Sequence, residues 1–351
     1  MDELRRKIGQ LLLVGFRGLE FDSHSAIARD LRDRNLGGVI LFNEELADPS
    51  FASRNVESAP QLKRLVHDLQ AAARAPLFVA IDQEGGRVSR LKPEHGFPPT
   101  LSHAELGALR DPARTFSEAD SIAATLASLG VNLNLAPVVD LDAHPNNPII
   151  AAKGRSFSRD PEVVARHAAE FCRAHQQRGI LSCAKHFPGH GSARGDTHLG
   201  MVDVTETWGE AELIPFRQLI EPGRCDLVMT AHVIHRMLDP EWPATLSKPV
   251  VTGLLREKLG FAGVVISDDL QMKAISDNYD LKTALELSLH AGIDLLCFAN
   301  NSSFDEDITS TVIEEIAALV AEGRIAESRL DESLQRINRL KTLPAFRIKA
   351  A

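Results

Sequence analysis

The side chains most able to do chemistry lie in one short stretch, KHFPGHGSARGDTHLG, which runs from Lys185 to Gly200. It combines a lysine, an aspartate and three histidines with four glycines. Histidine titrates near neutral pH, and glycine allows sharp turns of the backbone. Three kinds of site fit this composition, namely a metal centre, a phosphate-binding loop and an acid–base pair.

The first two kinds of site fit the stretch poorly. His186, His190 and His198 could ligate a metal, but helical metal motifs need fixed offsets, and Pro188 with its neighbouring glycines forbids a helix. Metal-dependent hydrolase barrels usually carry an H-x-H pair at the end of the first strand, and this sequence has none there. The GHGSARG segment could form a backbone nest for phosphate, but no lysine follows in the P-loop position. We therefore expect no metal and no cofactor.

The third kind of site fits the spacing of Asp196 and His198. In an extended segment, side chains two residues apart lie on the same side, so this carboxylate can reach the imidazole. A carboxylate partner orients the ring, selects its tautomer and favours its protonated form. Flexible glycines around the pair would let such a loop close over a substrate. The alternative is a solvated ion pair without function.

The elements that must position these groups are apolar runs separated by amphipathic segments. Most of the runs are continuous rather than alternating, which is typical of parallel strands covered on both faces. Helices are predicted between them, for example over residues 60–75, 117–130, 160–179 and 247–260. The eight candidate strands cover residues 11–16, 37–42, 76–82, 131–140, 180–187, 225–233, 263–269 and 293–300.

Eight alternations of strand and helix predict a (β/α)₈ barrel of the TIM type within the α/β class. A doubly wound open sheet is the second possibility, but the segment after the first strand lacks the glycine fingerprint of that fold. The glycine-rich segment after residue 82 has the wrong spacing for it. We predict one domain over residues 1–351, ending in a helical tail over about 303–345 that is interrupted near Gly323.

A barrel places its reactive groups where the strands end, and polar residues cluster there in this sequence. Polar groups at the end of an apolar strand cost desolvation unless a site uses them. Several have plain alternatives, because Arg87 could form a loop ion pair, Asp140 could cap a turn or pair with a cation, His232 could be a satisfied core histidine and Asn300 could serve a turn. The strand-end residues are Asp82, Arg87, Arg90, Asp140, Lys153, Arg155, Lys185, His186, His232, Asp268, Asp269 and Asn300.

The bulk composition excludes several classes of function. The 351-residue chain has a formal net charge of −9 and no basic run, which argues against binding to nucleic acid or to an anionic membrane surface. We find neither a signal peptide nor an apolar stretch long enough to span a bilayer. The four scattered cysteines read as buried thiols. We expect a soluble, cytoplasmic and monomeric protein.

The motifs K-H-F-P-G-H-G and D-x-H resemble those of glycoside hydrolase family 3, and most closely its bacterial β-N-acetylglucosaminidases of peptidoglycan recycling. The similarity extends to DQEGGRVSR at 82–90, KGRSF at 153–157 and ISDDLQM at 266–272, and it covers about residues 5–340. One departure is Thr197, where serine is more usual in the family, although the hydroxyl is preserved.

This resemblance implies a retaining mechanism. Asp268 would be the nucleophile that forms a glycosyl-enzyme intermediate, and the choice over Asp269 rests on the family alone. His198 would be the general acid and then the general base, with Asp196 as its partner. The family motifs further imply that the sugar pocket consists of Asp82, Arg90, Arg155, Lys185 and His186.

The implied activity is an exo-β-N-acetylglucosaminidase (β-N-acetylhexosaminidase). The expected substrate is a cytoplasmic cell-wall fragment, GlcNAc-1,6-anhydroMurNAc, with or without its peptide. Two alternatives stay open. One is a phosphorylase, in which phosphate replaces water as the acceptor, and the other is a catalytically silent sugar-binding sensor.

Overall fold

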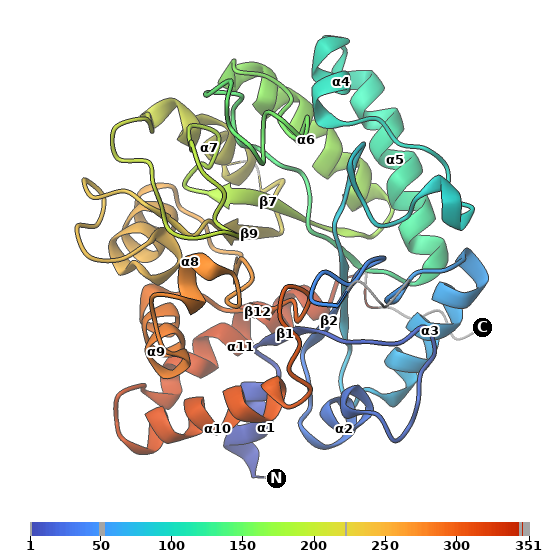
Figure 1. Ribbon diagram of the computed structural model, residues 1–351, viewed down its shortest axis with the longest axis vertical. Coiled ribbons are helices and arrows are strands. Elements are labelled where there is room, and N and C mark those ends of the chain that lie inside the picture. The colour runs from blue at the N-terminus through green and yellow to red at the C-terminus, as the bar shows by residue number, and fades with distance from the viewer. Residues whose placement is uncertain (1, 49–52, 222, 344–345, 347–351) are drawn as a thin grey trace.

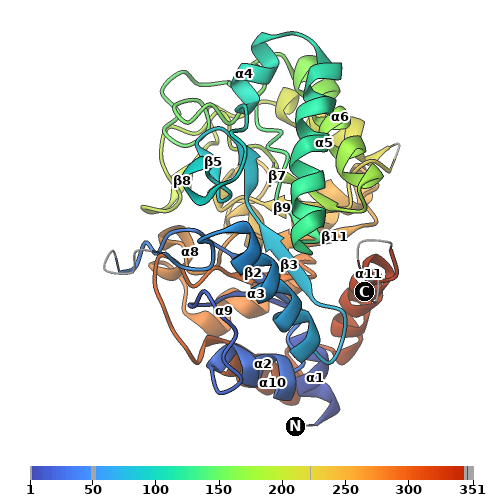
Figure 2. The same ribbon diagram turned by 90° about the vertical axis from the view of Figure 1, so that its right-hand side faces the viewer.

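The computed structural model describes residues 2–48, 53–221, 223–343 and 346, and its centre is a barrel of parallel strands surrounded by helices (Figure 1, Figure 2). Each barrel strand pairs in parallel with its neighbours, and β1 pairs with β12. A bridge between Ile266 and Leu295 joins the remaining edges, so the predicted (β/α)₈ barrel is confirmed. The barrel strands are β1 (Leu12–Gly15), β2 (Gly38–Leu41), β3 (Phe78–Ile81), β6 (Leu133–Asn134), β7 (Leu181–Phe187), β9 (Leu227–Thr230), β11 (Val264–Ser267) and β12 (Leu296–Phe298).

Two strands differ from the sequence prediction. The run over 131–140 contributes only β6 and an isolated bridge between Val138 and Lys185, because Pro137 has no amide to donate to a ladder. The run over 225–233 is split, since β9 ends at Thr230 and β10 (Val233–Ile234) pairs with β8 (Val202–Asp203) in a separate small sheet. The first strand of this small sheet, β8, begins two residues after the stretch that ends at Gly200.

Several helices begin or end at capping residues that their sequences supply. Ser58 and Ser102 form capping boxes, and Gly130 and Gly292 end their helices in the left-handed conformation. Three of the four helices predicted by range are α-helical, whereas the segment around 249–258 is a π-helix. The helices are α1 (Glu3–Gly9), α2 (Ala26–Asp33), α3 (Ala59–Ala72), α4 (His103–Ala108), α5 (Pro112–Leu129), α6 (Pro161–Gln177), α7 (Ile214–Ile220), the π-helix η4 (Pro249–Lys258), α8 (Lys273–Ser276), α9 (Leu281–Ala291), α10 (Ile308–Ala321) and α11 (Glu327–Lys341), with short 3₁₀ turns η1 (Pro93–His95), η2 (Glu210–Leu213) and η3 (Ala244–Leu246).

The C-terminal region forms α10 and α11 on either side of Gly323, whose φ is 72°. Helix α11 is tied to the barrel through the buried Asp294, which accepts hydrogen bonds from Ser333 at 2.7 Å and Arg336 at 3.0 Å. Residues 344–345, the end of the predicted tail, lie outside the described residues. All four cysteines are buried and free. Among the described residues, no helix combines the length and the apolar character that crossing a bilayer requires.

Candidate active site

The predicted site residues converge at the carboxyl-terminal ends of the barrel strands. Asp82 directly follows β3 and Asp268 directly follows β11, while Lys185 and His186 lie near the end of β7. The register of β7 against β9 shifts between Lys185 and Phe187, an irregularity that re-aims side chains at a strand end. The polar side chains at these strand ends and in the loops after them therefore gather at one end of the barrel, where barrels of this type place their active sites, and this cluster is called the pocket below.

The loop after β3 folds back over the barrel mouth as a small hairpin of β4 (Gln83–Gly85) and β5 (Val88–Ser89). Gly85 has a φ of 108°, and a Cβ on it would stand 2.1 Å from the backbone oxygen of Leu101. Only glycine fits this close approach. The sharp turn brings Arg90 back to Asp82 and points Glu84 into the protein, where it is almost fully buried.

Lys185 joins the two carboxylates of this hairpin. Its Nζ lies 2.6 Å from Asp82 Oδ1 and 2.8 Å from Glu84 Oε1, while Arg90 Nη2 lies 3.2 Å from Asp82 Oδ2. Burial alone would raise the pKa of Asp82, but the charges of Lys185 and Arg90 outweigh it and lower that pKa. Asp82 therefore stays ionised and can accept hydrogen bonds from hydroxyl groups.

Glu84 also holds Arg155, which reaches the pocket from the long loop after β6. The contact is bidentate, with Arg155 Nε and Nη2 each 2.8 Å from an oxygen of Glu84. Burial opposes ionisation of Glu84, yet Arg155 and Lys185 keep its pKa well below the ordinary value. The sequence reasoning did not select Glu84, although it stands inside the motif DQEGGR, and that motif was the available signal.

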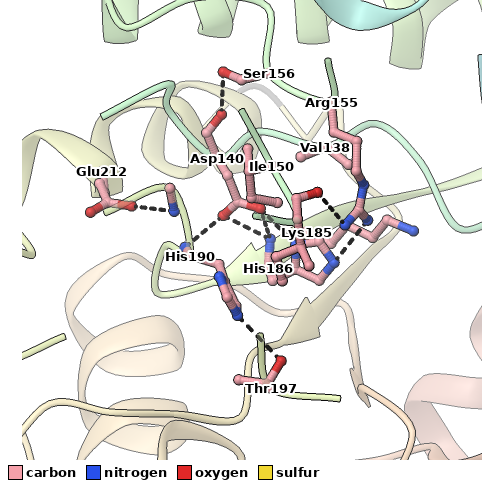
Figure 3. A network of polar contacts seen from close by, with 12 residues as sticks. Val138, Asp140, Ile150, Arg155, Ser156, Lys185, His186, His190, Thr197 and Glu212 are labelled. Atoms are coloured by element: carbon pink, nitrogen blue, oxygen red, sulfur yellow. Dashed lines mark hydrogen bonds and ion pairs between the residues drawn. The ribbon is translucent and has the colours of Figure 1, made fainter. Parts of the chain in front are cut away.

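Asp140 is the centre of a second network, which links the sugar pocket to the glycine-rich loop after β7 (Figure 3). Its carboxylate accepts from His186 Nδ1 at 2.6 Å and from the His190 backbone amide at 2.8 Å. The other ring nitrogen of His186 lies 3.3 Å from Arg155 Nη2. Asp140 was expected to cap a turn or to pair with a cation. It does cap the turn after β7, since the backbone amides of His186 and His190 donate to it, and it also binds the ring of His186.

The two aspartates after β11 have different surroundings. Asp269 Oδ1 accepts from the backbone amides of Ala299 and Gln271 at 3.0 and 3.1 Å, and burial raises its pKa to about 6. Asp268 is less enclosed. Burial would raise its pKa too, but the charges of nearby His232, His186 and His198 lower it to about 2. Asp268 is thus the carboxylate kept ionised by nearby histidines, and its Oδ1 accepts from the Asp269 amide at 2.8 Å, whereas Asp269 holds the amides of two other segments.

Asp196 and His198 form the predicted pair, but in a turn rather than in the expected extended segment, because the Leu199 amide donates to the backbone oxygen of Asp196 at 3.0 Å and the His198 amide donates to the Asp196 carboxylate at 2.9 Å. His198 Nδ1 lies 2.8 Å from Asp196 Oδ1, and the imidazole side chain is 47% exposed. Burial works against protonation of His198, but the hydrogen bond to Asp196 and the charge of Asp268 outweigh it and raise the pKa of the imidazole. With Nδ1 bound to Asp196, the proton available for transfer is the one on Nε2.

Two of the remaining strand-end residues, His232 and Asn300, take the plainer of their readings, whereas the contact of Arg87 is a hydrogen bond to a backbone oxygen rather than the expected ion pair. His232 is a satisfied core histidine, with its ring nitrogens 2.8 Å from Thr245 Oγ1 and 2.9 Å from the backbone oxygen of Asp269. Asn300 is a turn residue with a φ of 54°. Arg87 donates to the backbone oxygen of Ala152 at 3.3 Å. The rings of the three histidines of the opening stretch have different partners, since His186 binds Asp140, His190 contacts Thr197 and His198 binds Asp196.

The arrangement offers an ionised carboxylate, a histidine tuned toward protonation and a rim of ion-paired donors and acceptors. Such a set suits a neutral, hydroxyl-rich molecule, because the charged groups of the rim are already paired with one another and can still offer further hydrogen bonds. A carboxylate and a proton donor on the same pocket are also the two groups needed to cleave a glycosidic bond.

Comparison with known sequences supports this chemistry. Residues 3–340 match the glycosyl hydrolase family 3 N-terminal domain. A β-hexosaminidase A from Pseudoalteromonas piscicida is 34% identical and matches 88% of this chain, which spans only 53% of that relative. A β-hexosaminidase from Tolumonas auensis is 37% identical, with 83% of each chain covered.

Solved structures agree with the sequence matches. A family 3 β-N-acetylglucosaminidase from Paenibacillus superimposes with a TM-score of 0.88 at 36% identity, covering 97% of this chain and 62% of that one. A β-N-acetylhexosaminidase from Beutenbergia cavernae gives a TM-score of 0.86 at 30% identity and covers 97% and 99% of the two chains. The chain therefore belongs to glycoside hydrolase family 3, in its group of β-N-acetylhexosaminidases.

Proposed function

We propose that the protein is a retaining exo-β-N-acetylglucosaminidase in which Asp268 is the nucleophile and His198, with Asp196, is the acid–base group. One observation carries the proposal. His198 is hydrogen-bonded to Asp196 at 2.8 Å in the loop after β7, and the carboxylate of Asp268 stands at the end of β11, where its charge helps to raise the pKa of His198 while its own pKa is lowered to about 2. Near neutral pH, the nucleophile is therefore ionised while the histidine can both hold and release a proton.

The reaction would proceed in two displacements. An oxygen of Asp268 attacks the anomeric carbon while His198 Nε2 donates its proton to the leaving oxygen, so the glycosidic bond breaks and a glycosyl-aspartate forms. The neutral His198 then takes a proton from water, whose oxygen attacks the same carbon and releases Asp268. The histidine ends protonated again, and the sugar keeps its β configuration.

The sugar would occupy the pocket around the Asp82–Lys185–Glu84 cluster. Asp82 can accept from ring hydroxyls, while Arg90, Arg155, Lys185 and His186 can donate to hydroxyls or to the acetamido carbonyl. Lys185 is well suited to this task, because its ammonium has three donors and the two carboxylates occupy two of them.

The substrate we propose is a muropeptide fragment with a terminal β-linked GlcNAc on anhydro-N-acetylmuramic acid, cleaved by a monomeric enzyme in the cytoplasm. The support is the resemblance of the motifs to those of recycling enzymes, together with similar solved structures that are named β-N-acetylglucosaminidases.

The test compares hydrolysis of 4-nitrophenyl β-GlcNAc with that of the β-glucoside, followed by trapping with a fluorinated sugar donor and peptide mapping. We expect preference for the acetamido sugar and a label on Asp268. A sugar 1-phosphate as the main product in phosphate buffer would instead identify a phosphorylase. Binding of GlcNAc without any turnover would identify a sensor.

A further inference from the structure

Thr197 stands between the two members of the acid–base pair, yet its side chain points away from the solvent and is 2% exposed. Its hydroxyl oxygen lies 3.3 Å from His190 Nε2, a contact visible at the lower part of Figure 3. Its backbone oxygen accepts from the amide of Ala274 at 3.2 Å. One residue of the exposed loop is therefore bound to two separate parts of the barrel mouth.

The two contacts connect Thr197 with different parts of the site, namely the segment that carries Asp268 and the residues around Asp140. Ala274 belongs to α8, which follows the strand end that carries Asp268. His190 leads to the sugar pocket, because its backbone amide donates to Asp140, the same carboxylate that holds the ring of His186. Thr197 thus connects the acid–base pair with the nucleophile's segment on one side and with the sugar-binding residues on the other.

The first part of the loop, at His190 and Gly191, is fixed by several hydrogen bonds from neighbouring segments. Asn147 Nδ2 donates to the backbone oxygens of His190 and Gly191 at 2.8 and 3.1 Å, and Glu212 accepts from the Gly191 amide at 3.0 Å. A Cβ on Gly191 would stand 1.9 Å from the backbone oxygen of Leu141, so the loop base lies directly on the neighbouring segment. His190 is therefore a fixed point from which the rest of the loop can be oriented.

We propose that His190 and Thr197 are positioning residues, whose mutual hydrogen bond holds Asp196 and His198 in place over the bond to be cleaved. Burial lowers the pKa of His190 to about 4, so its ring is neutral near neutral pH and acts as a hydrogen-bonding partner rather than as a charge. The role rests on the proposed function, because it presumes that His198 transfers the proton.

The test exploits the leaving group. A substrate with a poor leaving group, such as a GlcNAc disaccharide, needs protonation by His198, whereas a dinitrophenyl β-GlcNAc does not. In Thr197→Val, which keeps the shape and loses the hydroxyl, we expect kcat/KM for the disaccharide to fall at least about tenfold, since misplacement of a catalytic group is costly. For the dinitrophenyl glycoside, kcat/KM should change less than about twofold.

Two variants serve as comparisons. Thr197→Ser retains a hydroxyl and should keep most of the disaccharide activity. Thr205→Val removes a hydroxyl that bonds Asp203, on the strand after the loop, and should leave both rates unchanged. In a double-mutant cycle, adding His190→Phe to Thr197→Val should cost little more than the larger single change, because both remove the same bond.

Several outcomes would overturn the inference. Equal losses on both substrates in Thr197→Val would mean that the threonine only stabilises the fold, as would a failure of Thr197→Ser to retain activity. Independent, multiplying effects in the cycle would separate His190 from Thr197. If the loss of kcat/KM depends on the leaving group in His198→Ala but not in Thr197→Val, only the inference about Thr197 is wrong. If the loss in His198→Ala does not depend on the leaving group either, the proposed acid role of His198 is wrong.

Discussion

The sugar pocket and the acid–base loop both contain charged and titratable side chains, but these side chains differ in their exposure to solvent and in the number of their charged partners. In the pocket, Lys185 and Glu84 have side chains that are 3% and 1% exposed, and each contacts two oppositely charged groups. In the loop, His198 is 47% exposed, and its one charged hydrogen-bond partner, as far as the described residues go, is Asp196. The charged side chains of the pocket are thus buried and joined by several ion pairs, whereas the acid–base loop has one hydrogen-bonded pair that is partly exposed to solvent.

This difference separates two kinds of catalytic contribution. Buried, mutually paired charges hold one geometry, so the pocket is organised before the sugar arrives and acts on every substrate that enters. A half-exposed pair contributes only when a proton has to move. Changes in the pocket should therefore affect all glycosides alike, whereas changes in the loop should depend on the leaving group.

The largest expected effect comes from Asp268→Ala, which removes the group common to all substrates. We expect turnover of both activated and unactivated β-GlcNAc glycosides to fall at least about 10⁴-fold, as for other lost nucleophiles, while the thermal unfolding curve stays cooperative. The control is Asp269→Asn, which keeps an acceptor for the Ala299 and Gln271 amides and should remain active. The reverse pattern would assign the nucleophile to Asp269.

The effect of His198→Ala on kcat/KM should depend on the leaving group of the substrate. Removing a general acid costs about 10²–10⁴-fold, so kcat/KM for a GlcNAc disaccharide should fall in that range, whereas kcat/KM for a dinitrophenyl glycoside should change little. Because the second displacement also loses its base, kcat for the activated substrate should fall, and azide, which needs no base, should restore it. Steady-state kinetics with and without azide measure both effects, and uniform losses would contradict the acid role.

Glu84→Gln should show the opposite behaviour in the pocket. The change leaves Arg155 without its bidentate partner and Lys185 with Asp82 alone, so we expect kcat/KM to fall about 10–10²-fold for every leaving group. Breaking a buried ion pair should also lower the free energy of unfolding by about 3 kcal/mol, measured by denaturant titration.

The matched control for that variant is Glu314→Gln, which breaks an exposed ion pair with Arg5 far from the barrel mouth. It should change neither kinetics nor the denaturation midpoint appreciably, because exposed pairs contribute little. A leaving-group dependence in Glu84→Gln would mean that the pocket and the loop are not separable in the way proposed here.

The two regions also differ in how far their sequence predicts them. The barrel and the strand-end residues were predictable, since apolar runs mark the strands and parallel strands end on the same face. The spacing of two in the sequence pointed to the pair Asp196–His198, but the reason differs from the expected one, because the two residues meet in a turn and not in an extended segment. Glu84 and the Thr197–His190 contact were not predictable, because both depend on where an irregular loop turns its side chains. Likewise, strand parity places Asp268 and Asp269 on opposite faces without saying which one faces the pocket.

The smallest effect we expect is a displacement of the pH profile in Asp196→Asn. The hydrogen bond and the charge of Asp196 both raise the pKa of His198, and protonated His198 is required for the first displacement. In the wild type, kcat/KM for the disaccharide should fall as pH rises through that raised pKa. Without the carboxylate the pKa of His198 drops, so this alkaline limb should move to lower pH, with only a few-fold loss below it.

The profile for a dinitrophenyl glycoside provides the internal control. Its kcat/KM requires only the ionised Asp268, whose pKa of about 2 lies far below the range measured, so the profile should be flat from weakly acid to alkaline pH in both proteins. An unmoved alkaline limb for the disaccharide in Asp196→Asn would show that Asp196 orients the imidazole without tuning its charge. That result would mean that the charge of Asp268, rather than that of Asp196, raises the pKa of His198. The protonation of the loop histidine would then depend on the nucleophile at the end of β11.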